Sequence, residues 1–195
     1  VAAWLEMTRS AKQVLDVGAY SGCMSIMAAL NNPSCHVHAF EAMPRTVERL
    51  SVNCKLNGVA DKVTIHNLAV SDKDGTVLIH MPRPRDFLGT GNSIFHKPNV
   101  RMVDQLEVKS GPIAAALANA GADEAPVSCI KLDVEGHEMP ALKGMVEIIE
   151  RDRPSLIVEV WAHEKEELFA FFEALHYRRE QLQGMNWLFV PRQHV

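Results

Sequence analysis

The sequence predicts an α/β protein built on one doubly wound, mainly parallel sheet with an antiparallel strand at its C-terminal end. Short apolar runs alternate with longer helical patterns along the chain, as in folds with helices on both faces of a sheet. The apolar runs are continuous rather than alternating, which is typical of strands buried on both faces. The last segment departs from this rhythm and predicts a closing hairpin.

In the first half of the chain, a helix is expected to follow each of the first two strands. Pro44 suits a first helical position, where a missing N–H costs nothing, and Asn57 with Gly58 marks that helix's end. The expected strands are residues 13–17, 35–40, 63–70 and 76–80, and the expected helices are 24–30 and 44–56.

The second half begins with a long polar loop, residues 82–99, of a length that is usually functional or disordered. A turn at residues 184–186 predicts the final hairpin. The expected strands are 127–132, 156–161, 177–182 and 187–190, and the expected helices are 113–120, 139–149 and 164–175.

Composition narrows the class of protein. The 195 residues are 47% hydrophobic, and 20 Lys and Arg against 24 Asp and Glu give a net charge of −4, which argues against nucleic-acid binding. The sequence contains no apolar run long enough for a membrane span and no leader pattern, and its four cysteines form no CxxC pair. A cytoplasmic protein without a zinc site or a disulfide framework is expected.

The first strand runs into a small-residue turn that ends at Gly22. Glycines at 18 and 22 let the backbone turn tightly and approach a ligand at the start of a helix. A dinucleotide fingerprint would read GxGxxG, but here the spacing is GxxxG and Tyr20 would crowd a pyrophosphate. The loop therefore favours a nucleoside ligand without phosphates, although a plain strand-to-helix turn is equally compatible with the glycines.

The second strand ends at Glu41, 19 residues beyond Gly22. A carboxylate at this position can accept both hydrogen bonds from a ribose diol. A solvated charge at a strand end is the alternative, and the glycine loop before it favours the ribose.

Ionisable side chains gather where the later strands end. Asp133, Glu135, His137 and Glu138 follow one strand, and such clusters shift one another's pKa values in ways that suit proton transfer. Glu159, within the next apolar strand, and His163 follow, and these acids and histidines together match no recognised metal spacing, so no metal is expected.

These segments together resemble class I S-adenosylmethionine-dependent methyltransferases, and more narrowly the FkbM family. The distinctive run is "IKLDVEGHE" at 130–138 with "LKG" at 142–144. Supporting matches are "VLDVGAYSG" at 14–22, "FEAMP" at 40–44, "NCKLNG" at 53–58, "AVSDKDG" at 69–75 and "IVEVW" at 157–161.

The resemblance implies a Rossmann-like, seven-stranded methyltransferase fold over 1–195, as a single domain lacking part of an N-terminal cap. It implies S-adenosylmethionine as the cofactor and a hydroxyl of a small metabolite, such as a sugar or polyketide, as the acceptor. The implied cofactor-binding residues are Asp16, Gly18, Ala19, Tyr20, Ser21, Gly22, Glu41, Ala42, Ala69, Val70 and Asp133, and the candidate substrate-binding residues are Asn92, Ser93, Glu159 and His163.

An alcohol is a poor nucleophile until it loses its proton, so a general base is expected. We assign this role to His137, with Asp133 and Glu135 orienting it or the substrate; Arg83 and Arg85 are candidates for an anionic group, although a solvated basic loop explains them as well. A cofactor-binding module without catalysis, a nicotinamide-dependent oxidoreductase and a homo-oligomeric assembly are left open.

Overall fold

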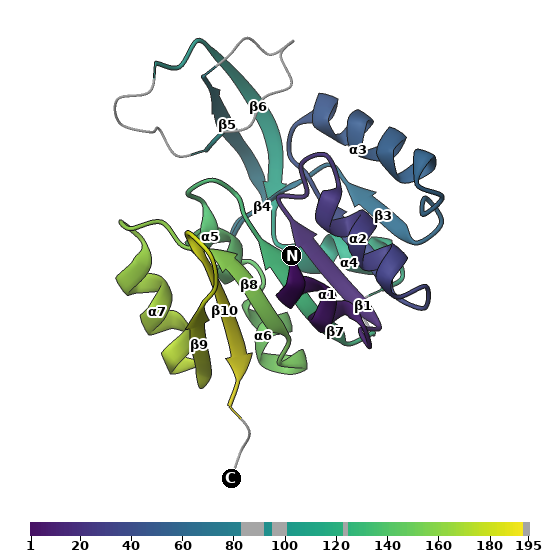
Figure 1. The fold of residues 1–195 in the computed structure, drawn as a ribbon. Coiled ribbons are helices and arrows are strands. Elements are labelled where there is room, and N and C mark those ends of the chain that lie inside the picture. Colours follow the sequence, from purple (N-terminus) through teal and green to yellow (C-terminus); the bar gives the residue numbers. More distant parts are fainter. Residues whose placement is uncertain (83–91, 95–100, 123–124, 193–195) are drawn as a thin grey trace.

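The computed structural model describes residues 1–82, 92–94, 101–122 and 125–192 (Figure 1). Its main sheet has seven strands in the order β3-β2-β1-β7-β8-β10-β9. The strand β10 pairs antiparallel with both of its neighbours, whereas β1, β2, β3, β7 and β8 are parallel to one another. The predicted fold class is thereby confirmed. The strand bounds are β1 (Gln13–Val17), β2 (His36–Phe40), β3 (Val63–His66), β7 (Val127–Leu132), β8 (Ser155–Glu159), β9 (Tyr177–Gln181) and β10 (Asn186–Pro191).

Helices cover both faces of this sheet and form a separate core on each. On one face lie α1 (Ala2–Thr8), α2 (Cys23–Asn31) and α3 (Pro44–Leu56), with Trp4 and Leu50 fully buried. The other face carries α4 (Ile113–Asn119), α5 (Glu138–Lys143), α6 (Val146–Asp152) and α7 (Lys165–Ala174), with Leu132 and Phe172 in its core. The strand-to-helix rhythm of the sequence therefore becomes a doubly wound arrangement.

A smaller, three-stranded sheet projects from the main one, and the sequence did not predict it (Figure 1). It has the order β4-β6-β5, formed by β4 (Ala69–Val70), β5 (Gly75–Met81) and β6 (Asp104–Gly111). The expected strand 63–70 is wrong as a single element, because its two halves belong to different sheets. Asn67 lies at the break, and its side-chain amide donates to the carbonyl oxygens of Glu41 and Ala42.

Two further local differences have identifiable causes. The expected helix 139–149 is interrupted at Gly144, where a Cβ atom would lie 2.1 Å from the carbonyl oxygen of Ser71. This close approach of two backbones separates α5 from α6. Helix α1 was not expected either, and it is fixed to α2 by the hydrogen bond from the Trp4 indole to the Met24 carbonyl at 2.9 Å.

Candidate active site

A cavity of about 240 Å³ opens beside the ends of β1, β2 and β7. The strand order reverses at β1, and ligands bind at such a switch point in doubly wound sheets. The sequence-predicted residues that line it are Gly18, Tyr20, Glu41, Ala42, Ala69, Val70, Asn92, Ser93, Asp133, Glu135 and His137. Among the described residues, eight further ones line it and were not predicted: Val17, Phe40, Met43, Thr46, Leu68, Ile79, Ile94 and Val134.

The first loop of the cavity depends on Gly18. Its φ is +82°, and a Cβ atom there would lie 1.8 Å from the carbonyl oxygen of Asp133. The amides of Gly18 and Ala19 both donate to the Phe40 carbonyl, at 3.0 and 2.9 Å. Gly18 is therefore needed to bring the ends of β1, β2 and β7 together, which shapes the cavity floor.

Glu41 is fixed by backbone groups on two sides. The amide of Tyr20 donates to one carboxylate oxygen at 2.9 Å, and the amide of Met43 donates to the other at 2.8 Å. Burial raises the pKa of Glu41, while these backbone hydrogen bonds oppose that rise. Each carboxylate oxygen has two lone pairs and therefore keeps one for a ligand hydroxyl.

Four predicted cofactor-binding residues lie beside the cavity rather than on its wall: Asp16, Ala19, Ser21 and Gly22. Asp16 is buried, and its carboxylate accepts a hydrogen bond of 2.5 Å from the Ser25 hydroxyl. Burial raises the pKa of Asp16, and the Ser25 hydrogen bond and the Lys131 charge oppose this. The hydrogen bond between Asp16 and Ser25 therefore joins β1 to α2, and Asp16 itself is not part of the cavity wall.

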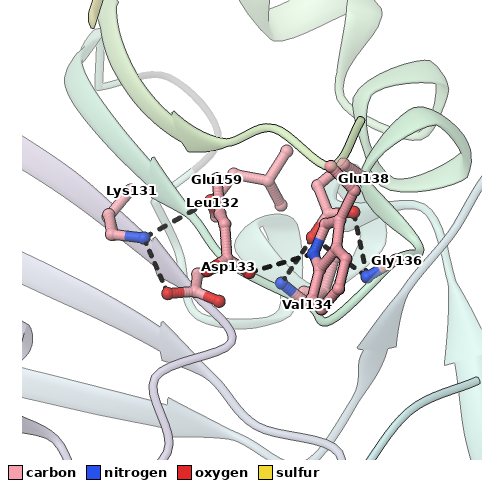
Figure 2. Close-up of polar contacts among 8 residues, drawn as sticks. Lys131, Leu132, Asp133, Val134, Gly136, Glu138 and Glu159 are labelled. Carbon is pink, nitrogen blue, oxygen red and sulfur yellow. Dashed lines mark hydrogen bonds and ion pairs between the residues drawn. The ribbon is translucent and has the colours of Figure 1, made fainter. Parts of the chain in front are cut away.

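The Asp133 carboxylate lies at the cavity wall and is held by Lys131. The Lys131 ammonium is 3.0 Å from Asp133 Oδ2, although the lysine itself is only 7% exposed (Figure 2). Glu159 lies behind, with its carboxylate accepting from the Trp161 indole at 3.1 Å, and burial together with Asp133 and Glu135 raises its pKa. Neither Glu159 nor the exposed His163, both predicted to bind substrate, lines the cavity.

His137 lines the cavity and is hydrogen-bonded on one side of its ring. Its Nε2 lies 3.1 Å from the Ser71 hydroxyl, which itself donates to Asp72 at 3.3 Å. Because that hydroxyl has one hydrogen, it accepts from His137, so Nε2 carries the proton and Nδ1 has the free lone pair. Burial lowers the pKa of His137, against the opposing charges of Asp72 and Glu164, which favours the neutral imidazole.

Asn92 and Ser93, the candidate substrate contacts, lie on the cavity wall. Ser93 forms a short antiparallel bridge with His80 of β5, through hydrogen bonds of 2.8 and 3.1 Å between their backbones. Its hydroxyl donates to the carbonyl oxygen of Glu135. Ser93 thus connects the smaller sheet to the loop after β7. The preceding residue, Asn92, also lines the cavity and carries an amide side chain. Arg83 and Arg85 lie outside the described residues.

Some of the site residues that the sequence analysis did not name lie within or next to motifs that it did name. Phe40 and Met43 flank Glu41 within "FEAMP", and Ser71 directly follows the predicted Ala69 and Val70. Ile79 had no such signal, because it reaches the cavity only through the smaller sheet. Within the described ranges, no group of three or more His, Cys, Asp or Glu side chains is placed to hold a metal ion. No helix found there has the length and apolarity that crossing a membrane requires.

The sheet order and the cavity at its switch point define a Rossmann-like fold with a ligand site at the carboxyl ends of its strands. The model of the methyltransferase FkbM domain matches residues 16–181. The chain therefore belongs to the FkbM methyltransferase family, whose cofactor is S-adenosylmethionine. No curated protein shows significant similarity to the chain.

Solved structures show the same fold at low sequence identity. A methyltransferase FkbM from Methylobacillus flagellatus is 16% identical with a TM-score of 0.60, over 92% of this chain and 43% of that one. The chain thus spans less than half of that relative's length. An O-methyltransferase from Bacillus cereus in complex with SAH is 12% identical (TM-score 0.60, 98% of this chain and 81% of that one). An rRNA methylase from Streptococcus thermophilus is 12% identical (TM-score 0.58, 97% and 92%).

The cavity residues suit S-adenosylmethionine in their chemistry. Glu41 offers carboxylate lone pairs for a ribose diol, and Asp133 offers a negative charge for an ammonium group. Leu68, Val70 and Phe40 provide apolar wall for a purine ring. Tyr20 also lines the cavity, at the position where a dinucleotide fingerprint has its second glycine.

Proposed function

We propose that this protein transfers a methyl group from S-adenosylmethionine to a hydroxyl group of a small metabolite, such as a sugar or a polyketide. The observation that carries the proposal is that one cavity joins Glu41 and Gly18 to His137 and Asn92. Groups suited to the cofactor and groups suited to an acceptor hydroxyl therefore share one space. The low-identity structural neighbours support the fold, and some of them are named O-methyltransferases.

The bound cofactor would supply an electrophilic methyl group on a sulfonium centre. The chain's task is then to orient the acceptor oxygen in line with that methyl and to remove the hydroxyl proton. His137 is neutral and has a free Nδ1 lone pair, and it is the group on the cavity wall best suited to take the proton. The resulting imidazolium would be stabilised by the charges of Asp72 and Glu164, which favour the protonated form.

The acceptor is proposed to be neutral and only partly polar. Ile79 and Ile94 give the acceptor side of the cavity apolar walls, and Asn92 provides an amide that can bind a hydroxyl or carbonyl. Carboxylates at Asp133 and Glu135 would repel an anionic group near the reacting oxygen. The formal charge of −4 also favours a small molecule over a nucleic acid.

Calorimetric titration with S-adenosylmethionine, S-adenosylhomocysteine and NAD tests the cofactor half of the proposal. We expect micromolar binding of the first two and none of NAD, with binding lost in Glu41→Ala, since the ribose acceptor is removed. Gln105→Ala, an exposed position on β6 away from the cavity wall, is the matched control and should bind normally. Binding of NAD alone would overturn the assignment, and silence from all three would favour a module without catalysis.

The acceptor half is tested by His137→Gln in a screen of sugar and polyketide acceptors. We expect turnover to fall by about 100-fold or more, which is within the range contributed by a general base. Affinity for S-adenosylhomocysteine should stay within about twofold, because the ring accepts a proton rather than binding the ribose. Unchanged turnover in the variant would exclude His137 as the base.

A further inference from the structure

The loop between β7 and α5 has an unusual backbone that something must hold in place. Glu135 has φ +58° and Gly136 has φ +95°, so two successive residues occupy the left-handed region. For a residue with a side chain this conformation costs on the order of 1–2 kcal/mol. Glu135 nevertheless lines the cavity, and so do Val134 and His137, the residues that precede and follow this left-handed pair.

The carboxylate of Glu138 accepts hydrogen bonds from the backbone amides of this loop. Its Oε1 accepts from the Val134 amide at 3.0 Å and from the Gly136 amide at 3.3 Å, and its Oε2 accepts from the Gly136 amide at 3.0 Å (Figure 2). The side chain is fully buried. From the other side, the Ser93 hydroxyl binds the carbonyl of Glu135. The polar groups around the left-handed residue are thus held by two side chains.

A second carboxyl group lies against Glu138. Glu164, at the N-terminal cap of α7, is hydrogen-bonded to Glu138 and, with burial as the larger cause, raises its pKa. Glu164 Oε2 is inaccessible to solvent, and no other side chain or backbone group of the described residues donates to it. Two carboxyl groups in such contact are satisfied by one shared proton, because both cannot be ionised without repulsion.

We propose that Glu138 is a positioning residue for the reaction, which holds the loop 134–136 in the shape that places Glu135 and His137 at the cavity. The proposal rests on the proposed function. Glu138 itself does not line the cavity and touches no reacting group. Its effect on the cofactor runs through the backbone, because the Val134 side chain and the Asp133 carbonyl adjoin Gly18.

The chemistry of the side chain gives a sharp pair of variants. Glu138→Gln keeps Oε1 as an acceptor for Val134 and Gly136 and places an NH₂ group in the position of Oε2, where it can donate to Glu164 as the protonated acid does but no longer accepts from Gly136. Glu138→Ala removes every one of these hydrogen bonds. Ile149→Ala, in the same hydrophobic core but away from the cavity, controls for general loss of stability.

Two measurements test the proposal. In amide hydrogen exchange without ligand, we expect Val134 and Gly136 to be protected in the wild type and in Glu138→Gln, and to lose protection in Glu138→Ala. In calorimetry with S-adenosylhomocysteine, Glu138→Ala should lose about tenfold or more in affinity, since misplacement by about 1 Å is enough for such losses. Glu138→Gln and Ile149→Ala should stay within about threefold of the wild type.

The outcomes separate the two proposals. Equal affinity in Glu138→Ala and wild type, or unchanged amide protection, would overturn the positioning role while leaving the proposed function standing. A wild type that binds no S-adenosylhomocysteine would instead overturn the proposed function and, with it, any role of Glu138 in the reaction. If Glu138→Ala fails to fold, Glu138→Met takes its place, since it keeps the bulk of the side chain but offers no acceptor to the two amides; wild-type amide protection and affinity in that variant would overturn the positioning role.

Discussion

Acid should destabilise this protein through a histidine that lies inside the sheet. His38, on β2, is 1% exposed, and its Nδ1 lies 3.0 Å from Nε2 of His66. Its own Nε2 is buried without a hydrogen-bond partner among the described residues. Burial, and then the neighbouring His36 and His66, lower its pKa from the ordinary 6.5 to about 4.

The size of the effect follows from these two pKa values. Below pH 6.5 the unfolded chain takes up a proton that the folded chain refuses until about pH 4, so stability present above pH 6.5 is lost as the pH falls between them. At about 1.4 kcal/mol per pH unit, the full loss is about 3 kcal/mol, and about 2 kcal/mol of it falls between pH 7 and pH 5.

Urea unfolding of the wild type and of His38→Gln, each at pH 7 and pH 5, measures this loss. The wild type should lose about 2 kcal/mol more than the variant over that interval. The pKa values of His36 and His66 are also lowered, mainly by burial, and both residues remain in the variant, so their contributions largely cancel in the comparison. An equal loss in the two proteins would refute the reasoning.

Three further substitutions test parts of the structure. Gly18→Ala should destabilise by about 2–4 kcal/mol and abolish S-adenosylhomocysteine binding, because the residue is left-handed and a Cβ would strike the Asp133 carbonyl; normal binding by calorimetry would contradict this. Ser25→Ala should cost about 1–3 kcal/mol in urea unfolding by stripping a hydrogen bond from the buried Asp16, and an unchanged midpoint would count against that role. Tyr177→Phe should cost about 1 kcal/mol, since its buried hydroxyl donates to a backbone carbonyl at 3.0 Å, while ligand affinity stays the same.

The parts of the fold that the sequence predicted are those with a strong local signal. Residues 13–17 appear as a strand at the expected bounds because five consecutive buried positions follow one another there. The strand β6 was not predicted although Leu106 and Val108 alternate with polar residues, because it exists only as part of the smaller sheet, in which it pairs with β4 and β5. The breaks at Asn67 and Gly144 arise from contacts with distant backbone, which a local pattern does not record.

The residues of the candidate site likewise fall into two groups, those with a local signal in the sequence and those without one. Gly18 and Glu41, which were predicted because strand ends and small-residue turns have recognisable spacings, both line the cavity. The hydrogen bonds of Ser71 with His137 and of Ser93 with Glu135 join residues 66 and 42 positions apart in the chain. Such partners depend on the tertiary structure, so the sequence indicated the chemistry of the site but not the side chains that orient it.

The smaller sheet contributes part of the cavity wall, and its residues pack in a hydrophobic cluster of their own. Met43, Ile79, Met81 and Val108 form a hydrophobic cluster distinct from the two that cover the main sheet. The same cluster includes Ala69 of β4, which pairs with Ser110 of β6, so β5 and β6 pack directly against residues of the cavity wall. A substitution at a buried position of β5 or β6 is therefore expected to reach the cavity wall at Met43 and Ala69 as well as at Ile79, so that its effects on the two ends of the cavity would be coupled.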